Sequence, residues 1–321
     1  MLKQKKNGVR LEGSYQLSKN LPMKLDKNTV LTIIFTLIDD IMEDPKIKSY
    51  LKRPGINPNL SDSEVVTLAL YQELLGENRE DHFYRLHQKN LRSYFPGLNE
   101  RSRYNRRKRD LYRVFLAVRL SLRTVLNLGE VKTTSIDSAP IPIMGYKRDK
   151  RHTDFTDAEY GYCSSKALKY FGYKLHTLVS LCGSIVDFCL TSAAPFDDQV
   201  VEEFVDRNKQ TINEVLGDKA YVSEELKKLL REQMGVMLYS PRKKNAKNTT
   251  QHLDENQGKI RLMVETVNAQ LQEQFKLSKS YAKSRWGFFT RVAAKITAHT
   301  IGQVINLILG RPKLALANLA V

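Results

Sequence analysis

The sequence predicts an α/β protein in which an all-helical part precedes a mixed sheet flanked by helices. Three observations support this fold class. Hydrophobic residues make up 41% of the 321 residues, which is typical of a folded globular chain. Up to about residue 129, apolar residues recur at three- and four-residue steps, the spacing of an amphipathic helix. Beyond that point short β-branched segments alternate with helical ones, an order typical of a sheet covered by helices.

The helical part is predicted over residues 23–129. A first helix begins near residue 28, where six apolar residues fall on one stripe: Val30, Ile33, Ile34, Leu37, Ile38 and Ile41. Two prolines within 54–58 interrupt this pattern. Ser61 and Glu64 then form the capping box of a helix that continues to residue 75. A further helix is expected over 81–94, and another ends at residue 129 with an apolar stripe of Leu111, Val114, Phe115, Val118, Leu122 and Val125.

The sheet part is predicted over residues 130–300. Strands are expected at 131–136, 172–181, 184–191, 215–218 and 235–240, with a tight turn at Gly183 between the second and the third. Residues 145–171 are polar, basic and tyrosine-rich, which indicates a long excursion between strands. Helices are expected after 195–198, after Ser223 and over 261–275. Residues 1–22 are predicted to be a loose basic tail, and 301–321 a basic and apolar C-terminal extension.

Composition limits the function as well as the fold. The chain carries 52 Lys and Arg against 35 Asp and Glu, and its formal charge of +17 points to a polyanionic partner. A basic but inert surface, or attraction to anionic lipid, would give the same total. The longest apolar runs, 31–38 and 296–309, are too short or too polar to span a bilayer. The three cysteines include no C-x-x-C pair, which argues against a zinc finger or a disulfide framework and favours the cytoplasm.

The positive charge is clustered. Residues 91–130 carry ten basic and three acidic side chains, and residues 276–321 carry eight basic and no acidic ones. The stretches 241–248 and 1–20 are also basic. Clusters interleaved with Tyr, Asn and Ser suit contact with a phosphate backbone, whereas a single basic run is often only a solvated face. The run 101–109 fits either a helix-turn-helix-like DNA reader or the charged outer face of a helical bundle.

Three acidic residues stand out by position. Asp137 follows an apolar strand, Asp218 ends the short strand at 215–218, and Glu265 lies on a helix. That helix has an apolar stripe of Val264, Val267, Leu271 and Phe275, and beside it a polar stripe of Arg261, Glu265, Asn268 and Gln272. Two strand-end aspartates and a helix glutamate suit Mg²⁺, and two such ions support in-line phosphoryl transfer. Taken singly, each acid also fits a cap, a turn or an ion pair between Glu265 and Arg261.

The ordered motifs SIDSAP, YGYCSSK, FGYKLH, LGDKAY and RLMVETVNAQL resemble those of the DDE transposases of bacterial insertion sequences, in particular insertion-sequence family 982. The resemblance covers most of residues 60–300, including RSRYNRR and RWGFFTR. It implies an RNase H-like catalytic domain after a helical DNA-binding domain, with Asp137, Asp218 and Glu265 as the metal-binding catalytic triad. Related transposases often carry a Tyr before the Arg and a Lys seven residues after the Glu. Here Gly258 and Gln272 hold those places.

The same resemblance implies a cofactor and partners. We expect two Mg²⁺ or Mn²⁺ ions, double-stranded DNA as terminal inverted repeats and target, and a homodimer or higher multimer in the prokaryotic, nucleoid-associated cytoplasm. One ion would activate water for strand cleavage, and the freed 3′-OH would then attack target DNA. No covalent protein intermediate is needed.

The predicted DNA contacts come from the basic clusters and the family motifs. They are Arg101, Arg103, Arg106, Arg107, Arg109, Tyr162, Lys166, Lys174, Arg242, Lys243, Arg261, Arg285, Trp286 and Arg291. Trp286 fits either stacking on a base or packing inside the protein. Tyr160 and Tyr162 fit either the DNA path or a solvated loop. We expect His176 to be structural rather than to assist the metal ions.

Two other functions stay open from the sequence. One is a non-catalytic DNA-binding regulator, against which the order strand-Asp, strand-Asp, helix-Glu argues. The other is a non-transposing nuclease of the same fold, which strand joining to a second DNA would distinguish from a transposase.

Overall fold

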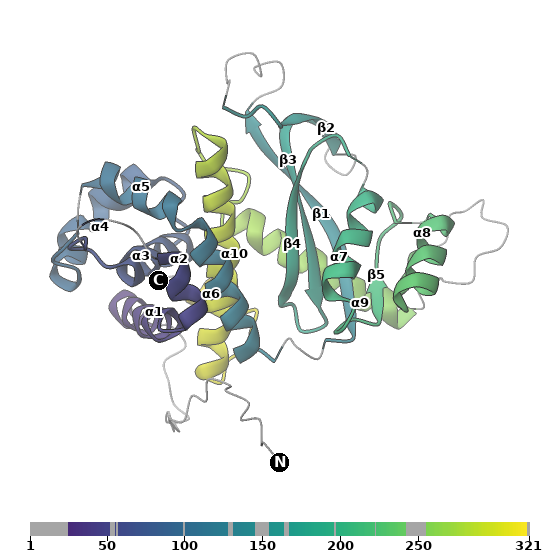
Figure 1. Cartoon of the computed structure of the whole chain (residues 1–321), viewed down its shortest axis with the longest axis horizontal. Coiled ribbons are helices and arrows are strands. Elements are labelled where there is room, and N and C mark those ends of the chain that lie inside the picture. Colours follow the sequence, from purple (N-terminus) through teal and green to yellow (C-terminus); the bar gives the residue numbers. More distant parts are fainter. Residues whose placement is uncertain are drawn as a thin grey trace.

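The computed structural model describes residues 25–51, 55, 57–98, 100–127, 131–144, 154–163, 167–195, 197–221, 223–241 and 255–319. The predicted tail at 1–22 and the predicted boundary at 129–130 lie outside these residues. So do Lys166, Arg242 and Lys243, three of the predicted DNA contacts. The described residues form a helical group beside a mixed sheet with its own helices (Figure 1).

Between residues 25 and 127 the described residues form helices and no strand. These are α1 (Lys27–Met42), α2 (Pro45–Leu51), α3 (Asp62–Leu74), α4 (Glu80–Tyr94), α5 (Arg101–Asp110) and α6 (Tyr112–Val125). The Asp26 carboxylate accepts from two backbone N–H groups at the start of α1, and Ser61 and Glu64 form the predicted capping box of α3. The basic run at 101–109 is a separate helix, α5, joined to α6 at Leu111.

The sheet has the strand order β2-β3-β1-β5-β6, with β4 also paired to β3. Its strands are β1 (Thr133–Met144), β2 (Glu159–Cys163), β3 (Leu168–Ser180), β4 (Ile185–Ser192), β5 (Glu214–Leu216) and β6 (Met237–Tyr239). Strand β3 is antiparallel to β1, β2 and β4, whereas β5 is parallel to β1 and β6. Gly183 takes a φ of +76° in the turn between β3 and β4, as predicted. The predicted excursion at 145–171 is wrong in part, because it contains β2 and the start of β3.

Strand β1 continues well beyond its predicted end at residue 136, so Asp137 lies inside the strand and not after it. The strand contains Pro140 and Pro142, although proline cannot donate to a strand ladder. Strand β5 pairs with β1 only from Thr133 to Ser135. Beyond Ser135, β1 is therefore paired on one side only, by β3, and can accommodate both prolines.

Helices cover both faces of the sheet. On one face α7 (Val201–Asn208), preceded by the short helix η4 (Asp197–Val200), packs through Val201, Phe204 and Val205 on Ile136 and Leu178. The π-helical turn η5 (Leu230–Met234), which follows α8 (Glu224–Leu229), lies in the same cluster. On the other face α9 (Glu255–Glu273) packs against β1 and β3. Its predicted apolar stripe, Val264, Val267, Leu271 and Phe275, is buried.

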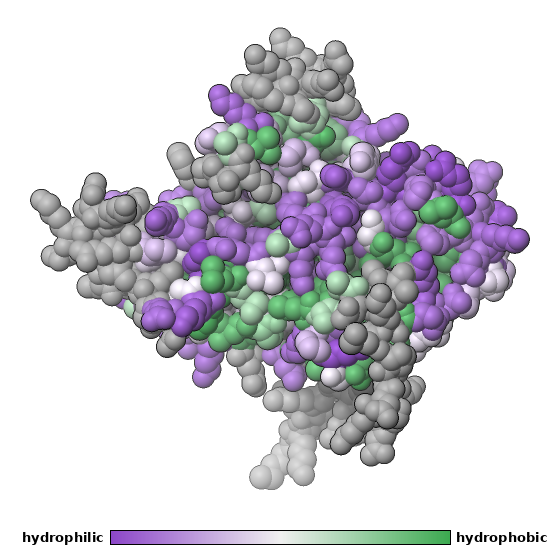
Figure 2. All heavy atoms as spheres, turned by 180° about the vertical axis from the view of Figure 1, so that it is seen from behind, coloured by the Kyte–Doolittle hydropathy of each residue, from purple (hydrophilic) through white to green (hydrophobic). Residues whose placement is uncertain are grey.

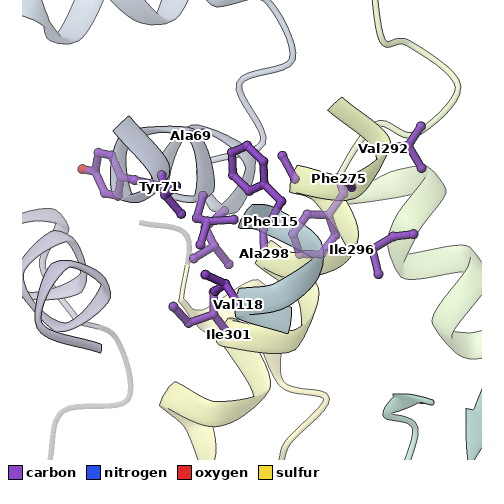
Figure 3. Close-up of a cluster of buried hydrophobic side chains, with 14 of the residues drawn as sticks. Ala69, Tyr71, Phe115, Val118, Phe275, Val292, Ile296, Ala298 and Ile301 are labelled. Carbon is purple, nitrogen blue, oxygen red and sulfur yellow. The ribbon is translucent and has the colours of Figure 1, made fainter. Parts of the chain in front are cut away.

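The long helix α10 (Arg285–Ile308) joins the two groups of helices, and a short 3₁₀ turn, η6 (Leu316–Asn318), follows it. It packs against α3 and α6 as well as against the end of α9. Figure 3 shows part of the resulting core, to which Ala69 and Tyr71 of α3, Phe115 and Val118 of α6, and Val292, Ile296, Ala298 and Ile301 of α10 contribute together with Phe275, which follows α9. A helix that was not predicted, and that spans the predicted boundary at residue 300, thus completes the core of the helical group. None of the described helices has the length and apolar character needed to cross a membrane.

Candidate active site

Asp137, within β1, and Asp218, just after β5, occupy equivalent places relative to two neighbouring parallel strands. Ser135 of β1 is paired with Leu216 of β5, and each aspartate lies two residues beyond its member of that pair. Because the strands run in the same direction, both aspartates lie toward the same end of the β1–β5 pair. The Asp218 carboxylate also accepts from the backbone N–H of Ala220 at 2.8 Å, which fixes the turn after β5.

Glu265 approaches these aspartates from α9. Its side chain is 49% exposed and pairs with Arg261, one turn earlier, at 2.6 Å between Nη2 and Oε1. The polar stripe of α9 faces β1: Asn268 donates to the Asp137 Oδ2 at 3.0 Å, and Gln272 donates to the Pro140 carbonyl oxygen at 3.2 Å. The helix therefore brings Glu265 to the same side of β1 as Asp137.

The electrostatics of Asp137 indicate a cluster of carboxylates. The pKa of Asp137 is raised from 3.8 to about 6, mainly by burial and in smaller part by the negative charges of Asp218 and Glu265. Hydrogen bonds from the Ser138 backbone N–H and from Asn268 act in the opposite direction. Asp218 and Glu265 are thus close enough to Asp137 to act on its pKa.

Because of this raised pKa, ionisation of Asp137 should lower the free energy of unfolding at high pH. A raised folded-state pKa stabilises the fold below about pH 4, and that contribution is lost as the pH rises through about 6. In metal-free protein at pH 8, Asp137→Asn should therefore increase the free energy of unfolding by on the order of 2 kcal/mol. Its melting temperature should rise accordingly. At pH 4 it should give no such gain. Thermal unfolding of both proteins at the two pH values measures this, with exposed Asp206→Asn as the control. An equal effect of Asp137→Asn at both pH values would contradict the shift.

The donor set fits a hard divalent cation in its chemistry, because every group in it is a carboxylate oxygen. Mutual repulsion at Asp137 is the kind of strain that a bound cation relieves. Among the described residues, however, no three His, Cys, Asp or Glu side chains already lie close enough to hold one ion. The Glu265 carboxylate is paired with Arg261.

The opposite face of β1 carries a second polar group. Ser138 donates to Asp197 at 2.8 Å, and Lys174 donates to the other oxygen of Asp197 at 2.9 Å. Lys174 also donates to the Pro195 carbonyl oxygen at 2.7 Å. Lys174 was predicted to contact DNA, but its ammonium group binds Asp197 and Pro195. These contacts hold the loop that leads into α7.

His176 takes part in a part-buried hydrogen bond. It is buried on β3, with its Nε2 2.9 Å from the hydroxyl of Thr191. Because the Thr191 hydroxyl donates to the Ser192 carbonyl oxygen, it accepts from His176. Burial lowers the pKa of His176 to about 4, so its imidazole is neutral near pH 7.

The structure divides four of the five predicted arginine contacts of α5 into two sets, and the fifth, Arg109, is partly buried. Arg101, Arg103 and Arg106 are exposed. Arg107 is a correction: only 11% of its side chain is exposed, because it pairs with Asp62 at 2.8 Å and donates to the Leu60 carbonyl oxygen. Figure 2 shows the molecule from behind, where hydrophilic residues predominate over the end that carries α4 and α5, at the right of the view.

A second correction concerns the start of α10. Arg291 is buried, where it donates to the Ser280 carbonyl oxygen at 2.5 Å and lies 3.5 Å from Glu73, so its guanidinium does not face solvent. Trp286 is half exposed and is packed on Tyr112 with ring centroids 5.0 Å apart. Its indole N–H donates to the Arg109 carbonyl oxygen at 3.2 Å, which joins α10 to α5.

Arg285 and Tyr162, two further predicted DNA contacts, lie at the start of α10 and on β2. Arg285 is half exposed and pairs with Asp157 at 2.9 Å, and Tyr173 donates its hydroxyl to the same aspartate. Tyr160 and Tyr162 of β2 are exposed. In Figure 1, α5, the start of α10 and β2 all lie along the upper part of the molecule.

Sequence reasoning named the three acids but missed the roles of Thr177 and Asp197. Thr177 faces Asp137 across the β1–β3 ladder and binds Asn268, and Asp197 binds Ser138. Only Asn268 left a signal in the sequence, since it shares the polar stripe of Glu265.

A mixed sheet with helices on both faces and two acids just beyond the paired residues of two parallel strands is an arrangement that suits an α/β enzyme site built on carboxylates. Residues 129–285 match the family model of the transposase DDE domain, a span that contains Asp137, Asp218 and Glu265. This match supports a DDE transposase, a class of metal-dependent enzymes that cleave DNA. No curated protein and no solved structure matches the chain significantly.

Proposed function

We propose that this protein is the transposase of a bacterial insertion sequence, similar to insertion-sequence family 982. It binds the terminal inverted repeats of the element, cleaves DNA strands at those ends and joins them to target DNA. The observation that carries this proposal is the equivalent placement of Asp137 and Asp218 beyond paired residues of β1 and β5, with Glu265 brought to them by α9. All three lie within the matched DDE segment.

The proposed chemistry assigns a task to each acid. Asp137, Asp218 and Glu265 would hold the divalent cations, Mg²⁺ or Mn²⁺ and two in number, whose chemistry is to activate the attacking oxygen and to stabilise the leaving one. Asp137 must be ionised for this, and the hydrogen bonds from Asn268 and the Ser138 backbone favour that form. Arg261 neutralises Glu265 until the site is filled. Water attacks in the first step and the freed 3′-OH in the second.

The fold and the charge distribution support the remaining parts of the proposal. Strand β1 lies between antiparallel β3 and parallel β5, which is consistent with an RNase H-like sheet. The preceding helices with α5 would form the DNA-binding domain, over 23–129. Arg101, Arg103 and Arg106 on α5 would contact phosphates. We propose a dimer or higher multimer, because two element ends must be held together, and a prokaryotic, nucleoid-associated location.

A cleavage and joining assay tests the proposal. The substrate is a labelled duplex that carries the inverted repeat flanking the coding region, with Mg²⁺ or Mn²⁺ and a supercoiled target plasmid. Cation-dependent nicking at the repeat end followed by joining to the plasmid is expected. Nicking without joining would indicate a nuclease. Specific binding without nicking would indicate a regulator.

Salt dependence of binding distinguishes the exposed arginines of α5 from the buried one. Each phosphate contact contributes about −0.9 to the slope of log K against log salt. Arg103→Ala and Arg106→Ala should each reduce the steepness of that slope by about one and weaken binding to all sequences. Arg107→Ala should leave the slope unchanged and lower the melting temperature, because it breaks the pair with Asp62. Fluorescence anisotropy over a salt series measures the slopes. If Arg107→Ala reduced the slope while Arg103→Ala and Arg106→Ala left it unchanged, the division into exposed and buried arginines would be contradicted.

A further inference from the structure

We infer that Asn268 is a positioning residue, which fixes the Asp137 carboxylate and the distance between β1 and the helix that carries Glu265. This inference rests on the proposed function, since it names what orients the first acid of the proposed triad. Asn268 donates from Nδ2 to the Asp137 Oδ2 at 3.0 Å. The contact spans 131 residues of sequence and joins α9 directly to β1.

The orientation of the Asn268 amide is set by a second residue. Thr177 donates from its hydroxyl to the Asn268 Oδ1 at 3.1 Å. Because a hydroxyl that donates must meet the carbonyl oxygen of the amide, the NH₂ group is left to face Asp137. Thr177 is the register partner of Asp137 on β3, so the three side chains form one row across β1 and β3 on the face covered by α9.

This row is built into the core. Thr177 is fully buried and Asn268 is 7% exposed. In a buried setting, hydrogen bonds to a carboxylate are strong, and an amide held at both ends has one orientation. One oxygen of Asp137 is therefore held by Asn268, which fixes the plane of the carboxylate toward any ligand.

Asn268 also acts on Glu265 through the helix. The two residues are three apart on α9, so they lie on the same face one turn from each other. Anchoring Asn268 to Asp137 therefore sets how far along β1 Glu265 lies and how α9 is rotated. Loss of the anchor should leave α9 packed by Val264, Val267 and Leu271 but free to shift by small amounts.

Metal binding without DNA distinguishes positioning from a merely structural role. Mn²⁺ binding is measured by electron paramagnetic resonance titration with MnCl₂ on the wild type and on Asn268→Leu, which keeps the volume and removes the donor. The dissociation constant for Mn²⁺ should rise by roughly tenfold or more, the range found for residues that orient metal ligands. Thr177→Val should act in the same direction, and Thr177→Ser, which keeps the hydroxyl, should restore wild-type binding.

Gln270 provides the matched control. It lies on the same helix and donates to the Leu314 carbonyl oxygen at 2.8 Å, but it contacts none of the three acids. Gln270→Leu should lower the melting temperature and leave Mn²⁺ binding unchanged. If wild-type protein binds no Mn²⁺, the proposed function fails and this inference with it. If wild type binds Mn²⁺ and both Asn268→Leu and Thr177→Val bind it equally well, the inference is overturned and the proposed function stands.

Discussion

Replacing Asp137 with alanine is expected to abolish strand cleavage while leaving the binding of DNA ends intact. The loss in cleavage rate should be about 10³-fold or more, as found when one member of a catalytic group that acts as a unit is removed. Asp137 is the centre of the cluster, since Asp218 and Glu265 both act on its pKa and Asn268 is bound to it. Binding should persist because the exposed arginines of α5 lie on other elements.

The measurement compares cleavage of an end-labelled inverted repeat with gel-shift binding of the same duplex. Asp206→Ala is the matched control, because this exposed aspartate of α7 pairs only with Lys209, at 2.8 Å, among the described residues. It should cleave like the wild type. Cation-dependent cleavage by Asp137→Ala at the wild-type rate would remove Asp137 from the site. Loss of binding together with cleavage would show instead that the variant is misfolded.

The periodic parts of the fold could be predicted from the sequence, because their signals are local. The capping box at Ser61 and Glu64 and the turn at Gly183 need only residues within a few positions of each other. Helix α5 carried no such signal as a separate element, since Tyr104 and Lys108 are its only buried residues. The length of β1 was hidden by Pro140 and Pro142, which are tolerated only because β5 ends early.

The sequence singled out the three proposed acids by their positions beside predicted strands and on a helix, although Asp137 lies inside β1, but it did not indicate their supporting contacts. Thr177 meets Asn268 across 91 residues of sequence, and Ser138 meets Asp197 across 59. The same limit explains the two corrected arginines. Arg107 meets Asp62 across 45 residues and Arg291 meets Glu73 across 218, so a basic cluster in the sequence gave no sign that its members are buried.

A buried ion pair between Lys295 and Glu73, beside Arg291, is expected to have the largest effect on stability. Lys295 of α10 is fully buried, where it binds Glu73 of α3 and donates to the Phe275 carbonyl oxygen at 2.5 Å, just after α9. Arg291 lies 3.5 Å from the same glutamate. Burial lowers the pKa of Lys295 to about 8, while the adjacent positive charges hold the pKa of Glu73 below its ordinary value. Glu73 is therefore ionised at neutral pH and depends on these partners.

Lys295→Met should lower the free energy of unfolding by about 3–5 kcal/mol, because it leaves a buried carboxylate with one distant partner. Urea unfolding measures this, and Lys259→Met, in an exposed pair with Glu255, should change little. The triple variant Glu73→Leu, Arg291→Met and Lys295→Met should recover much of the loss, since neither a buried carboxylate nor the buried Arg291 is then left unpaired. A loss as large in the triple variant would mean that packing, not charge, decides the effect. Because this pair ties α3, α10 and the end of α9 together, Lys295→Met should also loosen the helix that carries Glu265 relative to the helices proposed to hold DNA.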